Sequence, residues 1–380
     1  AVLAKQLFGE RHPKVAKVLG FLGVAAQVKG NPAAAVEFFQ EGKGIFRDAG
    51  VLETSKEYLA TLQDLASAEL QTGAFDEALK HALETVAGGE TRLWSLFAGL
   101  SEYERLAFAR FHAAKMALLL SVDAEDDQSA LMQYEALLRW KGQISRSLSA
   151  SQRHLTPEAR AVYEQMKALD GQLWQAVLGA EENPIESQRI AAEYASLQRT
   201  FLNLTGTGRP EVPSFSDVSQ SLPTNTVAVD FYVYPRYRKS FDDGSPWGNS
   251  ELVAWIFTAG QAVPNRVDLG PVDDLQSEVE SYLDYLVPTR GGRALGAKKD
   301  RPGTSLRKNL WDPLKPYIGE SSMVFVSPDS FLATLPLETL PVGEEEFLIE
   351  QHAFVYAQDM VSLALQEELE ESREIGRAHV

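Results

Sequence analysis

Two stretches near the N-terminus carry the same pattern of leucine, small residue and turn residue. The first stretch contains Leu22-Gly23, Gly30 and Ala35, and the second contains Leu65-Ala66, Gly73 and Ala78. The two patterns are offset by 65 − 22 = 43 residues. Small residues let two helices approach closely, and a glycine after a helix supplies a left-handed cap. We therefore expect two stacked helical hairpins.

This pattern resembles the tetratricopeptide repeat, in an extended form of roughly 42 residues per unit. Leu19 and Leu62 stand where that family usually has an aromatic residue. The resemblance implies an array of repeats over residues 1–90, with a further unit before Ala1. It also implies a groove that binds a protein or peptide partner.

A helical pattern continues over residues 91–205. Thr156-Pro157 and Asn183-Pro184 are typical helix starts, because a capping side chain or a proline suits the first turn. Residues 123–128 are expected to form an acidic linker. Residues 206–222 are rich in Gly, Pro, Ser and Thr, which predicts a linker between domains.

Beyond residue 222 the pattern changes to short β-branched and aromatic runs alternating with helical stretches. The expected strands are residues 226–234, 251–258 and 322–327, and the expected helices are residues 272–286 and 305–318. Strands that alternate with helices predict an α/β domain with a buried, largely parallel sheet. The fold class is thus a helical array followed by an α/β domain.

Several phrases in this second half resemble the N-terminal part of a CHAT domain, a caspase-like domain found behind tetratricopeptide repeats. The closest phrase is residues 324–340, with the turn Pro328-Asp329 and the segment Leu335-Pro336 through Leu340. Residues 310–314 and 353–357 also fit. Ser330 and Leu337 stand where the family usually has a glycine and an aromatic residue. The resemblance assigns residues 223–374 to this domain and residues 138–142 and 189–204 to its helical lead-in.

The family resemblance implies a cysteine peptidase with a His and Cys dyad. The chain contains no cysteine, and none of its histidines is followed by the glycine that the family usually has. They are His12, His81, His112, His154, His352 and His379. We interpret His352 as a structural residue near a strand, and we predict no catalytic, cofactor-binding or metal-binding residues.

Three other motifs have simpler interpretations. Residues 305–308 have the Ser-x-x-Lys spacing of some acyl enzymes, but Ser305 is expected to cap a helix. The basic stretch from Arg290 to Arg301 lacks the spacing of a phosphate-binding loop and is expected to be a loop. Residues 123–127 lack the glycine of a calcium loop and are expected to be solvated. A nucleotide-binding domain would need a glycine-rich turn that the sequence lacks.

The formal net charge of −17 argues against nucleic acid and anionic membrane surfaces as partners. Without a long apolar run or a secretory pattern at residues 1–10, we expect a cytoplasmic protein. The sequence does not indicate its oligomeric state.

Two hypotheses about function remain open. In the first, the helical repeats bind a partner and regulate a caspase-like peptidase domain, whose His and Cys lie beyond this chain. In the second, the chain belongs to a non-enzymatic scaffold with a degenerate CHAT domain. Residues 375–380 match the translation of a sequencing adapter, which predicts a truncated chain with an exposed sheet edge and poor solubility.

Overall fold

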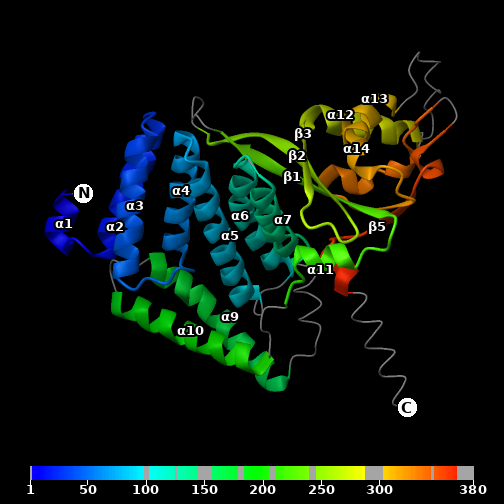
Figure 1. The fold of residues 1–380 in the computed structure, drawn as a ribbon. Helices are drawn as coiled ribbons and strands as arrows, with labels where there is room; N and C mark the ends of the chain where they lie inside the picture. Colours follow the sequence, from blue (N-terminus) through cyan, green and yellow to red (C-terminus); the bar gives the residue numbers. More distant parts are fainter. Residues whose placement is uncertain are drawn as a thin grey trace.

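The computed structural model describes residues 2–97, 102–124, 126–143, 156–178, 184–205, 211–238, 245–286, 303–343 and 346–365. Helices make up the first part, and a sheet with short helices follows (Figure 1). Within these ranges, no helix has the length and apolar character needed to cross a bilayer. The helices described in the first part are α1 (Val2–Phe8), α2 (Pro13–Val28), α3 (Pro32–Asp48), α4 (Lys56–Thr72), α5 (Phe75–Phe97), α6 (Glu102–Ser121), α7 (Asp127–Trp140), α9 (Pro157–Leu178) and α10 (Pro184–Thr205).

The expected helical hairpins are α2 with α3 and α4 with α5, which stand side by side in Figure 1. Their first helices begin 56 − 13 = 43 residues apart, and their second helices begin 75 − 32 = 43 residues apart. Gly30 and Gly73 end the first helix of each hairpin with φ of 74° and 81°. Because side chains disfavour this left-handed region, glycine is the suitable residue at both turns.

Gly23 makes room for an aromatic ring. A Cβ atom at this position would lie 2.5 Å from Cε1 of the buried Phe39. At the same offset of 43, the second hairpin has Ala66 and Ala82, both buried. At these two positions the first hairpin has a glycine packed against a large ring, and the second hairpin has two alanines.

The second part contains one five-stranded sheet in the order β3-β2-β1-β4-β5. The strands are β1 (Thr226–Tyr237), β2 (Trp247–Thr258), β3 (Asn265–Pro271), β4 (Met323–Ser327) and β5 (Ala353–Tyr356). The β1–β4 and β4–β5 pairs are parallel, but the β1–β2 and β2–β3 pairs are antiparallel. The expectation of a largely parallel sheet is thus wrong. Residues 238–246 and 259–264 are too short for the crossover that parallel neighbours require.

The central strands are buried on both faces. In β2, Leu252, Ala254 and Ile256 belong to one core, whereas Val253, Trp255 and Phe257 belong to the other. The core that contains Trp255 also contains residues of α4 to α7, so the helices of the first part cover the face of the sheet on which Trp255 lies. Burial on both faces explains why the strands form continuous apolar runs in the sequence.

The opposite face is covered by α12 (Val272–Leu286) and a broken helical segment. Residues 305–318, expected as one helix, form α13 (Thr304–Leu306), η1 (Arg307–Trp311), η2 (Asp312–Leu314) and α14 (Lys315–Ile318). Pro313 and Pro316 lack the backbone N–H that a continuous α-helix needs. The short turns η3 (Ser330–Thr334), η4 (Leu337–Thr339) and η5 (Leu348–Glu350) complete this side.

The expected linker contains a packed helix. The described residues 211–222 include α11 (Phe215–Gln220), whose Phe215 and Val218 lie in the core shared by the helices and the sheet. The N–H of Phe215 donates to Oε1 of Glu135 in α7 at 2.8 Å. In contrast, α9 and α10 pack on each other around a small separate core.

We predict that Gly23→Ala destabilises the α2–α3 hairpin by about 1–3 kcal/mol, because the new methyl group overlaps the Phe39 ring. Gly20→Ala in the same helix is the matched control, since nothing lies within 4 Å of its Cβ position. Because alanine favours a helix more than glycine does, Gly20→Ala should raise the free energy of unfolding by up to about 1 kcal/mol. Urea unfolding followed by circular dichroism measures both, and equal midpoints would contradict the packing argument.

Candidate functional site

A buried lysine joins the helical part to the sheet. Helix α7 ends at Trp140, and Lys141 leaves it with extended backbone angles, φ −66° and ψ 137°. Its Nζ atom lies 2.6 Å from Oδ1 of Asp230 in the central strand β1. The two side chains are 9% and 1% exposed. A buried charge is tolerated when it has a close partner of opposite charge, as here.

The same ammonium group also binds two backbone carbonyls. Lys141 Nζ donates to the oxygen of Phe231 at 2.8 Å and to that of Ser327 at 3.1 Å. Asp230 and Ser327 are register partners in the parallel β1–β4 pair. An ammonium has three protons to donate, so these three acceptors satisfy it. Lys141 therefore holds together α7, β1 and the carboxyl end of β4.

Tyr134 donates a second hydrogen bond to the Asp230 carboxylate. Its hydroxyl donates to Oδ2 of Asp230 at 3.1 Å, and its ring stacks on Trp255 with centroids 5.2 Å apart. Burial and the Asp230 carboxylate raise the pKa of Tyr134 well above its usual value. The hydroxyl therefore stays protonated and remains a hydrogen-bond donor.

A second acidic residue lies just beyond β4. Asp329 Oδ2 accepts the N–H of Val233 at 2.8 Å. Burial raises the pKa of Asp329, while the Lys141 ammonium group opposes that rise. The next residue, Ser330, has φ of 52°. This left-handed angle gives a physical reason for the glycine that the resembling family usually has there.

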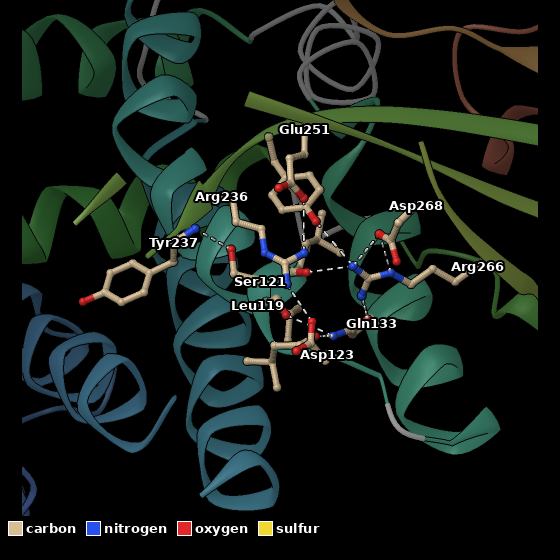
Figure 2. A network of polar contacts seen from close by, with 12 residues as sticks. Leu119, Ser121, Asp123, Gln133, Arg236, Tyr237, Glu251, Arg266 and Asp268 are labelled. Atoms are coloured by element: carbon tan, nitrogen blue, oxygen red, sulfur yellow. Dashed lines mark hydrogen bonds and ion pairs between the residues drawn. The ribbon is translucent and has the colours of Figure 1, made fainter. Parts of the chain in front are cut away.

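A second polar network fixes the end of α6 to the sheet (Figure 2). Arg266 of β3 donates to Gln133 Oε1 at 2.6 Å and to the carbonyl of Leu120 at 3.0 Å. The N–H of Tyr237 donates to Oγ of Ser121 at 2.8 Å. Figure 2 shows these side chains converging from the strands on the end of α6 and on α7, while the Tyr237 ring points away.

Arg236 links β1 and β2 to the segment between α6 and α7. Its guanidinium contacts Asp123 Oδ1 at 2.6 Å and Glu251 Oε2 at 3.2 Å. Asp126 accepts the N–H of Ser129 at 2.7 Å and caps α7. Asp123 and Asp126 are both exposed, as expected for a solvated segment, but they also have structural contacts that the sequence did not predict.

The histidines inspected in the sequence have structural contacts. The Nδ1 atom of His352 donates to the carbonyl of Ser321 at 2.6 Å, beside the ring of Trp311. His12 accepts the N–H of Lys14 and caps α2. His154 and His379 lie outside the described residues.

His81 lies between two charged side chains. Its Nε2 is 2.9 Å from Nζ of Lys43, and its Nδ1 is 2.7 Å from Oε2 of the buried Glu69. Since an ammonium only donates, this arrangement fits a neutral ring that carries its proton on Nδ1. The triad links α3, α4 and α5. His112 is also buried, and burial, then Lys115 and Arg92, lower its pKa to about 3.

Ser305, the serine of the Ser-x-x-Lys motif, lies inside a short helix. Ser305 is not the helix cap, because Gly303 occupies that position with φ of 85°. Ser305 instead lies inside α13, and its hydroxyl donates to Glu278 Oε1 at 2.6 Å. The basic stretch from Arg290 to Arg301 lies outside the described residues.

The junction around Lys141 binds the helical part to the sheet. Its ammonium donates to three acceptors, one carboxylate and two backbone carbonyls. Sequence reasoning missed the pairing of Lys141 with Asp230. One signal was present, because Asp230 is the single charged residue within the apolar run 226–234. A buried charge of this kind requires a partner from elsewhere in the fold.

Residues 300–377 match the family described as the CHAT domain. The match includes β4 and β5 and covers well under half of the chain. This part of the chain is therefore similar to the CHAT domain. The matched range also includes residues 375–377, part of the stretch that the sequence suggests to be an adapter. No curated protein matches the chain.

We predict that Lys141→Met destabilises the protein by about 3–5 kcal/mol, because it leaves the Asp230 carboxylate buried without a cation. Adding Asp230→Asn should restore part of this loss. Lys17→Met removes the exposed ion pair with Glu57 and should cost less than about 1 kcal/mol. Chemical unfolding measures all three variants. Similar losses for Lys141→Met and Lys17→Met would contradict the proposed role of the junction.

Proposed function

We propose that the helical part is a tetratricopeptide-repeat array that binds a protein partner and regulates the CHAT domain. In this proposal the CHAT domain begins near residue 223 and is a caspase-like cysteine peptidase in a longer protein. Its His and Cys would lie after the residues of this chain. The observation that carries the proposal is the Lys141 junction, which ties α7 to β1 and β4.

The junction supports regulation through a mechanical link. A partner that shifts the helices also shifts Lys141. The ammonium is bound to groups in the middle of β1 and at the carboxyl end of β4, where the parallel pairing of these two strands ends. Ligand and catalytic sites of open α/β sheets commonly lie at such strand ends. The shared core of helices and strands transmits the same displacement, because a close-packed interior has low compressibility.

The alternative is a non-enzymatic scaffold, in which the CHAT domain is degenerate. The absence of cysteine from all 380 residues favours this alternative for the chain itself. The two proposals differ in the residues expected further along the reading frame. The peptidase requires a His-Gly after an apolar strand and a Cys at the end of another strand, and a continued frame without them would contradict it.

Hydrogen exchange tests the regulatory link within this chain. If helices and sheet form one cooperative unit, Gly23→Ala should accelerate amide exchange in β1 and β4 as well as in α2 and α3. Gly20→Ala should leave exchange of the strand amides no faster than in the unaltered chain. Faster exchange confined to the α2–α3 hairpin would show independent units and contradict regulation through the junction.

A further inference from the structure

A cavity of about 240 Å³ lies where the helical hairpins face the sheet. Its walls come from α2, from α4 and from the neighbouring ends of β1 and β2. Val24 and Val28 form one side, Tyr237 and Trp247 form another, and Asp64 contributes a carboxylate. The cavity thus combines residues of the proposed repeats with residues of the sheet.

Asp64 has no counter-ion in the described part of the chain. Among the described residues that line the cavity, it is the one charged side chain, and none of the described residues donates a hydrogen bond to its carboxylate or forms an ion pair with it. Its backbone carbonyl accepts the Ser67 hydroxyl at 2.7 Å. Burial raises the pKa of the Asp64 carboxyl to about 7. A carboxylate in these surroundings gains free energy from any cation that reaches it.

The aromatic side of the cavity also suits a cation. Tyr237 and Trp247 meet edge to face, with centroids 5.3 Å apart. Burial raises the pKa of Tyr237 to about 12, and hydrogen bonding to Ser67 and Gln27 opposes that rise. The phenol is therefore neutral at physiological pH. Aromatic faces attract ammonium and guanidinium groups, and the carboxylate adds direct charge pairing.

The cavity continues into an exposed apolar stripe on α2. Phe21, Val24 and Val28 are 78%, 43% and 65% exposed. Their spacings, 24 − 21 = 3 and 28 − 24 = 4, place them on one face of the helix. If a peptide placed a basic side chain in the cavity, a neighbouring apolar side chain of that peptide could pack against this stripe.

We propose that this cavity binds a lysine or arginine side chain of a peptide segment from the partner, with Asp64 as its counter-ion and the Phe21–Val28 stripe holding an adjacent apolar residue. This inference rests on the proposed function, because it gives the chemistry of the partner that the repeats would bind. Peptide binding here would touch α2, α4 and both strands at once.

The probe is a positional-scanning library of nonapeptides, applied to the full 380-residue chain. The chain should enrich peptides with Lys or Arg beside an apolar residue, at least about tenfold over the same peptides with glutamine or citrulline. Asp64→Asn should abolish this preference. The matched control is Asp76→Asn, which alters an exposed carboxylate in the first turn of α5 and should keep the preference.

The pH dependence adds a second readout. A carboxyl with a pKa of about 7 is mostly protonated at pH 6 and mostly ionised at pH 8. Binding of the basic peptide should therefore strengthen between these pH values, and Asp64→Asn should remove the change. Tyr237, the other titratable group at the cavity, does not ionise in this range.

Three outcomes would overturn the inference. They are enrichment without a basic preference, a basic preference that survives Asp64→Asn, and no enrichment at all. The first two leave partner binding by the helical part intact. After the third, the hydrogen-exchange comparison decides separately whether helices and sheet are coupled, so failure of the cavity and failure of the regulatory proposal are distinguishable.

Discussion

The structure depends on a single cation placed where three chain segments meet. Lys141 comes from the end of a helix, Asp230 from the middle of the sheet and Ser327 from the end of a neighbouring strand. Burying a charge costs free energy, and only a set of partners in fixed positions offsets that cost. The pair therefore specifies one arrangement of helices and sheet, since other arrangements would leave a buried charge unpaired.

The rest of the interface is consistent with that arrangement. Arg266 and Ser121 fix the end of α6, Glu135 binds the start of α11, and Tyr134 lies between the helices and Trp255. These contacts surround an apolar core that contains residues from both parts of the chain. The composition of residues 206–222 suggests a division, but the core crosses it, so the sheet has no free face toward the helices.

Local sequence patterns predicted much of the fold. The offset of 43 residues and the glycines at 30 and 73 predicted the two hairpins, and residues 272–286 predicted α12 with its observed limits. Apolar runs predicted β1, β2 and β4 to within a few residues, whereas β5 was not among the expected strands. These features depend on neighbours in the sequence. The strand β3 was not expected, because it is a short edge strand with a bulge at its glycine-containing end.

The candidate sites were much harder to predict, because they depend on contacts between distant residues. Lys141 and Asp230 lie 89 residues apart in the sequence, and Asp64 meets Tyr237 only after the sheet packs against the hairpins. Strand direction was missed for a related reason. An apolar run indicates that a strand is buried on both faces. Whether the neighbouring strand runs parallel or antiparallel to it depends instead on the length of the connection between the two strands.

The paired positions in the two hairpins have a consequence for how such an array could be rearranged. The same two positions are filled by a glycine and a large ring in the first hairpin, Gly23 and Phe39, and by two alanines in the second, Ala66 and Ala82. Copying the second hairpin into the first place would leave a void where the ring stood, and the reverse exchange would force a ring into a space sized for a methyl group. The two units share a backbone plan but are not interchangeable modules, so their order along the chain is fixed by side-chain volume.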